Sequence, residues 1–190
     1  MSDAPVMDEP RRKGTSISGV HSGRAITHDW ITPKFILDAL GEFDLDPCQS
    51  PTQPWLCAKR GIVRPVDGLA EPWEGRVWCN PPYSVHAAAW LAKMGRHGHG
   101  TALVFARTET AMMFDHVWGV ASAILFLEGR LHFHYPDGRR AEANAGGPSC
   151  LIAYGRRDAD VLARCGLPGA LVERPRVIRA KGKGETGVLL

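Results

Sequence analysis

Short apolar runs alternate with longer segments of helical character along the middle of the chain. Runs typical of buried strands occur in "RVWC" (76–79), "GTALVFAR" (100–107) and "SCLIAYG" (149–155). The intervening segments 85–98 and 109–121 are rich in strong helix formers, and their apolar residues recur at helical spacing. Strands that alternate with helices predict an α/β sandwich with a largely parallel sheet.

The first part of the folded region is predicted to be a helix followed by a strand. Thr32 suits the cap of this helix and Pro33 its first position, the apolar residues of 35–40 recur at helical spacing, and Gly41 suits its end. The stretch "FDLDP" (43–47) then alternates apolar and acidic residues before a proline. We therefore expect a short strand that enters a loop.

Loops and short strands are predicted on both sides of this central region. Residues 49–75 contain four prolines and look irregular, with one short strand in "GIVRPVDGL" that ends at the Asp-Gly turn signal. The stretch 123–135 contains one or two strands, 136–148 a long loop, and 158–166 a short helix. Because the last strands follow each other without an obvious helix between them, we expect an antiparallel edge strand.

Composition sets the domain organisation and excludes some classes of protein. The chain has 190 residues, 44% of them hydrophobic and 23% charged, as in a soluble protein of one domain. We expect a flexible N-terminal tail (1–26), one domain (27–172) and a basic flexible C-terminal tail (173–190). No apolar run approaches the ~20 residues of a membrane helix, and the N-terminus lacks a signal sequence, so we expect no membrane partner and a cytoplasmic protein.

Neither the cysteines nor the histidines predict a metal site or a disulfide framework. The five cysteines are odd in number and include no C-x-x-C pair. His132 and His134 lie close together in sequence, but no carboxylates stand at the spacing that a zinc site requires. We therefore predict no metal, and free thiols suited to a reducing compartment.

The sequence "VWCNPPY" ends a predicted strand with an amide, two prolines and a tyrosine. Pro82 restricts Pro81 to an extended conformation, so the corner holds the Asn80 carboxamide and the Pro81 carbonyl at fixed positions. A nucleobase amine has one N–H for each of these two oxygens, and Tyr83 offers a ring on which an unstacked base can stack. Accepting both hydrogens frees the nitrogen lone pair to attack an electrophile. A rigid surface turn is the structural alternative.

The same residues carry a resemblance to a known family. "NPPY" is similar to the [DNS]-P-P-[YFW] motif of amino-group methyltransferases that use S-adenosylmethionine. The wider pattern "DWITP … FDLDPC … DGLAEPWEGRVWCNPPYS … ALVFARTET … FLEGRLHF … GGPSCLIAYG" resembles the phage-type DNA N6-adenine methyltransferases (Dam family) over residues 27–154. The resemblance implies a Rossmann-like methyltransferase sandwich, with a mostly parallel sheet, that methylates N6 of adenine in double-stranded DNA. Its catalytic residues are then Asn80, Pro81, Pro82 and Tyr83.

The resemblance also implies which residues bind S-adenosylmethionine. The segment "WITP" looks like the one that such enzymes place against the methionine end of the cofactor, and "DPC" looks like the first cofactor loop, although the glycine that usually follows it is missing. The acid of "VDGL" stands where a contact to the adenine amine is expected. The cofactor residues implied in this way are Thr32, Pro33, Asp46, Pro47, Cys48 and Asp67.

Alternation along the predicted strand adds an expectation about its acids. Asp44 and Asp46 should point to one face of the sheet and Leu45 to the other. A sulfonium nucleoside needs carboxylates for its amino group, ribose hydroxyls and adenine amine. Either acid suits such a contact, and an exposed loop position is an equally good interpretation of Asp44.

Basic residues are the candidates for contact with the DNA backbone. The net charge is +3, and the candidates for DNA binding are Arg107, Arg130, Arg139 and Arg140. "NPPY" alone also permits an N4-cytosine methyltransferase, and the basic tails permit a non-catalytic nucleic-acid-binding module. Neither the recognition sequence nor the oligomeric state can be predicted from this pattern.

Overall fold

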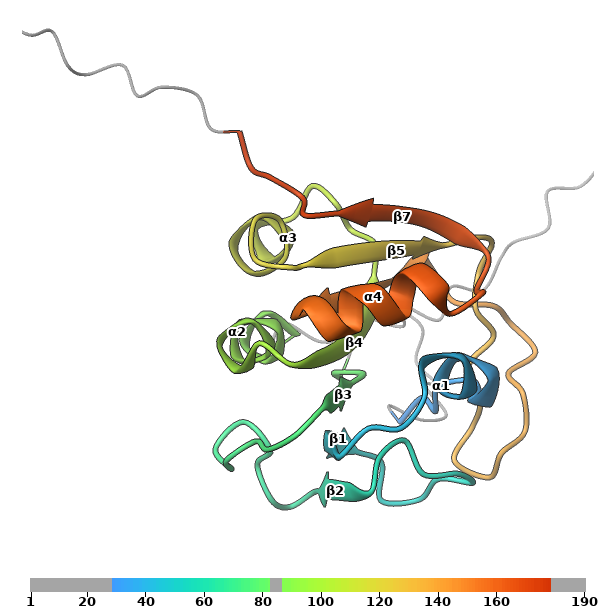
Figure 1. Cartoon of the computed structure of the whole chain (residues 1–190). Helices are drawn as coiled ribbons and strands as arrows, with labels where there is room; N and C mark the ends of the chain where they lie inside the picture. The colour runs from blue at the N-terminus through green and yellow to red at the C-terminus, as the bar shows by residue number, and fades with distance from the viewer. Residues whose placement is uncertain (1–28, 83–86, 179–190) are drawn as a thin grey trace, which may run out of the picture.

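The computed structural model describes residues 29–82 and 87–178, which fold around one mixed sheet (Figure 1). Within these residues the sheet has seven strands in the order β2-β1-β3-β4-β6-β5-β7. The elements in chain order are α1 (Lys34–Leu40), β1 (Leu45–Gln49), β2 (Arg60–Val63), β3 (Val77–Cys79), α2 (Ala87–His97), β4 (Gly100–Phe105), α3 (Ala111–His116), β5 (Ala123–Leu127), β6 (Ser149–Tyr154), α4 (Arg156–Arg164) and β7 (Gly169–Glu173).

The sheet is mostly parallel, as the alternating pattern predicts. Strands β2, β1, β3 and β4 pair in parallel. Strand β6 runs antiparallel between β4 and β5, so β5 points in the same direction as β4. Strand β7 pairs antiparallel with β5 and forms the edge. The expected antiparallel edge is therefore present, but a second antiparallel strand lies inside the sheet.

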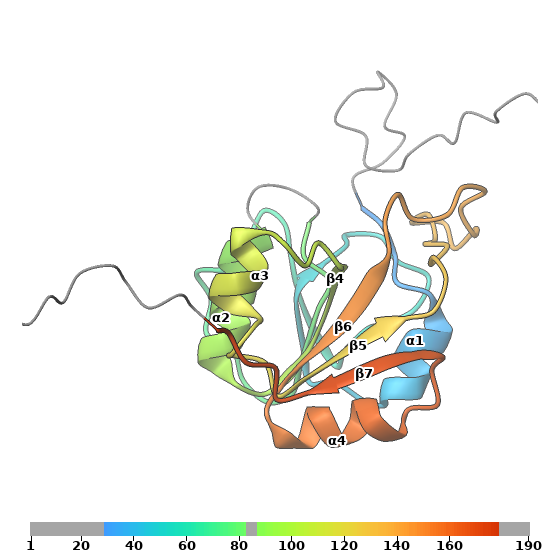
Figure 2. The same cartoon turned by 90° about the horizontal axis from the view of Figure 1, so that it is seen from above.

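Helices cover both faces of the sheet because the strands are apolar on both sides. Every residue of β6 is buried, as are five of the six residues of β4. The α1 face packs around Leu37, Trp78 and Leu103, and the α2 face packs around Leu91 and Val104. Figure 2 shows α2 and α3 on one side of the sheet and α1 on the other. This burial on two faces explains why the strands read as continuous apolar runs.

Three local expectations need correction. The N-cap of α1 is Pro33 rather than Thr32, and no side chain caps the helix. Strand β2 ends at Val63, before the turn that starts at Arg64, and so earlier than the Asp-Gly signal. Strand β1 continues through Pro47 to Gln49 instead of stopping at the proline, because its pairing with β2 shifts register after Asp46.

The C-terminal part of the sheet also differs in detail from the sequence pattern. Residues 123–135 contain one strand, β5, and then an isolated bridge at His134. All five residues of strand β7 (GALVE) are exposed, and its apolar run is only three residues long, so the sequence pattern does not indicate a buried strand here. Within the described residues no helix combines the length and apolar character needed to cross a bilayer.

Candidate functional site

Strand β3 places Asn80 at the end of the sheet where the carboxyl ends of the parallel strands lie. Val77 and Cys79 belong to the core on the α2 face, and Trp78 belongs to the core on the α1 face. Asn80 follows directly after the strand. Because β1, β3 and β4 run in parallel, their carboxyl ends lie at this same end of the sheet. Ligands of parallel α/β sheets bind beyond the carboxyl ends of the strands.

Two acceptors determine the orientation of the Asn80 carboxamide. Its Nδ2 donates to the Trp30 carbonyl at 3.2 Å and to the Thr32 hydroxyl at 3.3 Å. A carbonyl oxygen only accepts, so the nitrogen must be the atom that faces Trp30. The other amide atom, Oδ1, is buried and has no hydrogen-bond partner. The side chain therefore presents an unused acceptor.

The segment that holds Asn80 is itself held from two sides. Trp55 donates its indole N–H to the Thr32 carbonyl at 3.0 Å. Ile31 and His134 exchange backbone hydrogen bonds of 2.9 and 3.0 Å. The rings of Trp55 and His134 pack edge to face with centroids 5.1 Å apart. These contacts connect the long loop after β5 to the position of Asn80.

A cavity of about 50 Å³ lies beside the Asn80 corner. Three of its lining side chains carry a buried nitrogen or oxygen without a partner: Gln53 (Nε2), Trp78 (Nε1) and Asn80 (Oδ1). Such atoms are rare in proteins, and each leaves about 1–3 kcal/mol of desolvation uncompensated. The remaining lining residues are Asp29, Trp30, Ile31, Thr32, Asp46, Cys48, Ser50, Cys57, Pro81 and Pro82.

Asp46 contributes a carboxylate to this cavity without a cationic partner. The side chain is buried, and no ion pair among the described residues includes it. Its Oδ1 accepts from the Cys48 backbone N–H at 3.1 Å. Burial raises the pKa of Asp46 to about 6, against the opposing effect of hydrogen bonds from Cys48 and Cys57. At neutral pH the cavity therefore has an anionic wall.

The thiols of Cys48 and Cys57, which lie beside Asp46, are protonated at neutral pH because their pKa values are raised. Cys48 Sγ lies 4.0 Å from Cys79 Sγ and 3.3 Å from the Asn80 carbonyl. The neighbouring Cys79 and burial raise the pKa of Cys48, and burial and the Asp46 charge raise the pKa of Cys57. All five cysteines of the chain are free. A thiolate nucleophile does not fit these surroundings.

Several residues implied by the resemblance line this one cavity, and others do not. Those that line it are Thr32, Asp46, Cys48, Asn80, Pro81 and Pro82. Pro33 and Pro47 adjoin it in sequence, at the start of α1 and within β1. Tyr83 lies outside the described residues. Asp67 is exposed, and its carboxylate accepts from the Leu69 N–H at 2.9 Å.

The loop that carries Asp67 is nevertheless packed against β1. A Cβ at Gly68 would lie 1.9 Å from the Pro47 carbonyl, so only glycine permits this approach. Trp73 donates its indole N–H to the Gly68 carbonyl at 2.8 Å. The loop therefore lies against the "DPC" segment (46–48), although Asp67 itself is directed to solvent.

Asp44 and Asp46 have different roles despite their spacing. Leu45 packs on the α2 face, as the alternation predicts. Asp44 accepts from the Arg76 N–H at 2.8 Å and pairs with Lys59 at 3.2 Å, and its side chain is 45% exposed. Asp44 therefore fixes the entry into β3, and only Asp46 reaches the cavity.

The candidate DNA-binding arginines are exposed and lie on two loops. Arg107 follows β4, whose carboxyl end adjoins that of β3. Arg130, Arg139 and Arg140 belong to the loop after β5, which pairs through His134 with Ile31, between the two residues that hold Asn80. Arg139 pairs with Asp137 at 2.8 Å and lies over the Tyr135 ring. Burial and the nearby Arg140 lower the pKa of His134, so this histidine is neutral.

Gln53, Cys57 and the indole N–H of Trp78 are site features that the sequence pattern does not reveal. Gln53 and Cys57 come from an irregular proline-rich stretch without a periodic signal. The sequence pattern indicates a core position for Trp78, and its ring does pack in the core. Its position two residues before Asn80, on the same face of the strand, is the signal that places it near the site.

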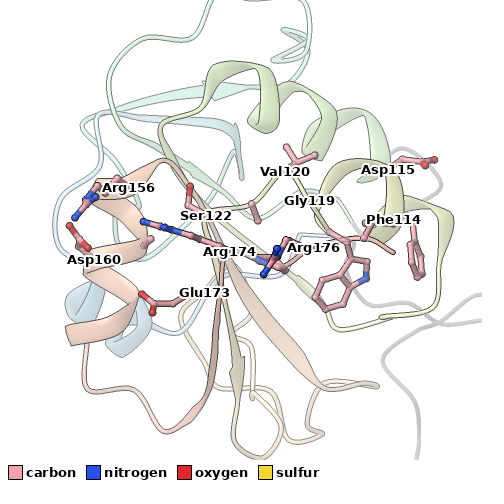
Figure 3. A pocket seen from close by; sticks show the side chains of 15 residues that line it. Phe114, Asp115, Gly119, Val120, Ser122, Arg156, Asp160, Glu173, Arg174 and Arg176 are labelled. Atoms are coloured by element: carbon pink, nitrogen blue, oxygen red, sulfur yellow. The ribbon is translucent and has the colours of Figure 1, made fainter. Parts of the chain in front are cut away.

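A larger crevice, of about 1180 Å³, lies at the opposite end of the sheet (Figure 3). It is bordered by Ser122, which precedes β5, and by Glu173, which ends β7. Figure 3 shows Arg174 extending toward Arg156 and Asp160 on α4. None of the described residues that line it carries a buried side-chain nitrogen or oxygen without a partner. The unmatched polar atoms therefore favour the smaller cavity as the candidate site.

Comparison with known proteins adds no assignment to this geometry. The chain matches no protein-family model, no curated protein and no solved structure. Among the described residues no group of three histidines, cysteines or acids is arranged to hold a metal ion. The function proposed below therefore depends on the geometry of the site and on the sequence resemblance.

Proposed function

We propose that the protein transfers a methyl group from S-adenosylmethionine to the N6 amine of adenine in DNA. The observation that carries this proposal is the orientation of Asn80, whose Nδ2 is used by Trp30 and Thr32 and whose buried Oδ1 has no partner. An amide acceptor held in this way suits an N–H of the substrate. The resemblance of "NPPY" to amino-group methyltransferases supplies the reaction class.

Asn80 and Pro81 act by positioning the amine. Asn80 Oδ1 accepts one amine hydrogen and the Pro81 carbonyl accepts the other, which turns the nitrogen lone pair out of the base ring. When bound, S-adenosylmethionine supplies an electrophilic methyl group on a sulfonium centre. No side chain needs to remove a proton before attack, because the product ammonium loses its proton readily. The rate enhancement then comes from positioning and electrostatics.

The sheet and the cavity walls are consistent with a bound cofactor. The parallel strands β1, β3 and β4 end together beside the cavity, as in Rossmann-like folds. Asp46 offers a buried carboxylate without a cation, which suits an ammonium or sulfonium group. Cys48 lines the same wall. Asp67 is a weaker candidate, because its carboxylate is turned to solvent.

Duplex DNA is the proposed partner, with adenine flipped out of the stack. Arg107 and the loop that carries Arg130, Arg139 and Arg140 are exposed around the Asn80 end of the molecule. Exposed arginines at this end suit phosphate contacts. Such contacts predict binding that weakens steeply with salt, independently of the base sequence.

The test is transfer of a labelled methyl group to unmethylated duplex DNA, followed by nucleoside analysis. We expect N6-methyl-2′-deoxyadenosine from the wild-type protein and a rate about 10²- to 10³-fold lower from Asn80→Ala. Asp160→Ala, on α4 at the opposite end of the sheet, is the control and should leave the rate unchanged. N4-methylcytosine as product would reassign the substrate. DNA binding without any product would replace the enzyme by a binding module.

A further inference from the structure

Strand β7 lies at one edge of the sheet, and its outer side pairs with no described residue (Figure 1). It pairs with β5 in one unbroken register from Gly169 to Glu173. The Arg174 N–H and the Pro168 carbonyl both bond to residues that flank β5. Backbone groups alternate in direction along an antiparallel strand, so those of Gly169, Leu171 and Glu173 point away from the sheet. They form a row of donors and acceptors that the described chain does not use.

This edge lacks the features that usually prevent further pairing. Natural edge strands carry lysine, proline, a bulge or an inward charge, or they are covered by another segment. Strand β7 has the sequence GALVE, its register is uninterrupted, and every residue is exposed. Glu173 at its end is the single charge in the strand. The edge is therefore suited to the addition of another strand, a common way of binding extended peptides.

On the α3 face, an added strand would meet apolar side chains. Val172 lies opposite Ile124, which belongs to the core on this face. Val172 is 38% exposed, and Phe114 and Val120 are 43% and 45% exposed. Phe114 and Val120 line the crevice that borders the end of β7. Side chains of an added strand that point to this face should therefore be apolar.

On its other face, an added strand would lie beside α4. Leu171 lies opposite Leu125 in the core of the α1 face, and Leu162 of α4 packs into the same core. Figure 2 shows α4 alongside β7. Figure 3 shows Arg174, which follows β7, extending toward Arg156 on α4. Side chains on this face should therefore meet guanidinium groups.

The stretch from α4 to the end of the described chain (156–178) has an excess of positive charge. Its acids are Asp158, which is buried and paired with Arg76, and the two acids Asp160 and Glu173. Acidic side chains would complement the α4 face, whereas a second copy of this edge would bring like charges together. The stretch has five arginines, all exposed and without an ion pair among the described residues: Arg156, Arg157, Arg164, Arg174 and Arg176.

We propose that β7 binds an extended segment of a partner protein in which acidic and apolar residues alternate. The acidic side chains lie on the α4 face near the arginines, and the apolar ones lie on the α3 face near Val172. Backbone hydrogen bonds to β7 supply affinity, and the alternation of side chains supplies specificity. This surface is separate from the Asn80 cavity and does not depend on methyl transfer.

Fluorescence anisotropy with the full chain tests this assignment. The probe is a fluorescein-labelled ten-residue peptide of alternating glutamate and valine. We expect it to bind, and a peptide with lysine in place of glutamate to bind about 10- to 100-fold more weakly. Only one of the two alternating sets of peptide N–H groups can point to β7. Methylation of that set of nitrogens should weaken binding about 10- to 100-fold, and methylation of the other set should have little effect.

Charge variants of exposed residues test the location of the peptide without disturbing the core. Arg156→Glu should weaken binding of the glutamate–valine peptide by about 3- to 10-fold. Arg60→Glu is the matched control, because it makes the same change at an exposed residue of β2, the opposite edge of the sheet. It should leave the affinity unchanged.

Each alternative occupant gives a different result. No binding, equal affinity for the glutamate and lysine peptides, or equal effects of both methylated sets overturns strand addition. A dimer in sedimentation that Leu171→Arg dissociates would assign the edge to a second copy instead. Weaker binding of duplex DNA but not of the peptide in Arg156→Glu would assign the arginines to nucleic acid. Loss of binding with one methylated set and in Arg156→Glu, but not in Arg60→Glu, supports the peptide site.

Discussion

Two buried polar regions lie at opposite ends of β3, and they are satisfied in different ways. Arg76 precedes the strand and donates to Asp158 on α4 at 2.7 Å, and Thr101 donates to the same carboxylate at 3.2 Å. Asn80 follows the strand and, with Asp46, borders a cavity in which no cation among the described residues balances the carboxylate. The first region carries matched charges, and the second does not.

The matched region has the character of a structural clamp. Arg76 also donates to the carbonyls of Leu40 and Glu42 at 2.8 and 2.9 Å, and its guanidinium lies over the Phe43 ring. One nitrogen of Arg76 and one oxygen of Asp158 lack partners, but opposite charges adjoin them. Neither residue lines either cavity. Unmatched polar atoms therefore indicate a ligand site only where they face open space and lack a compensating charge.

The largest effect is expected on breaking the clamp. Asp158→Ala leaves the Arg76 guanidinium buried without its counter-charge, which should lower the free energy of unfolding by about 3–5 kcal/mol. Urea unfolding measures the loss. Asp160→Ala, two residues further on the same helix, is the control and should change stability by less than about 0.5 kcal/mol. A loss below about 1 kcal/mol for Asp158→Ala would show that the clamp is dispensable.

Removing the charge of Asp46 should have the opposite effect on stability, because this buried charge destabilises the folded protein. Burial raises the pKa from 3.8 to about 6, so the folded state holds the proton more tightly than the unfolded state. Stability is then fully present below about pH 4 and falls as pH rises through about 6, by about 3 kcal/mol. Asp46→Asn cannot ionise, so it should gain stability relative to wild type across this window.

Unfolding free energies of wild type and Asp46→Asn at several pH values check this expectation. Asp44→Asn is the control, because hydrogen bonds from the Arg76 N–H and Lys59 lower the pKa of Asp44. Its contribution is lost only as pH falls below about 4, so its difference from wild type should be constant between about pH 4 and 6. Parallel stability curves for wild type and Asp46→Asn would show that Asp46 is not buried as described.

The two regions also differ in how far the sequence predicts them. Strand β3 and the position of Asn80 follow from an apolar run that ends at two prolines, because both signals are local. The partner of Arg76 lies 82 residues away on α4, and no local signal connects them. The fold class is therefore predictable, whereas the clamp depends on tertiary packing.

The cavity combines predictable and unpredictable residues for the same reason. Asp46 stands out in "LDPC", beside a predicted strand. Gln53 belongs to an irregular loop. Only the folded structure places its amide beside Trp78 and Asp46 in the same cavity, so its role cannot be predicted from the sequence. Thr32 is a suitable helix cap in sequence, but Pro33 takes the cap position and the Thr32 hydroxyl accepts from Asn80. Tertiary contacts override the local preference here.

The smallest expected effect on stability concerns Thr32, which distinguishes orientation from stabilisation within the cavity. Thr32→Val removes one of the two acceptors of Asn80 Nδ2 at nearly constant volume, so unfolding should become easier by only about 1 kcal/mol. The released carboxamide should lower kcat for methyl transfer by about 10- to 100-fold with KM little changed. Thr32→Ser restores the acceptor and should restore the rate.

A direct readout independent of turnover is the side-chain amide resonance of Asn80, which should shift in Thr32→Val and return in Thr32→Ser. Equal resonances in all three proteins would show that Thr32 does not hold the amide, and the orientation argument for Asn80 would then depend on the Trp30 carbonyl alone.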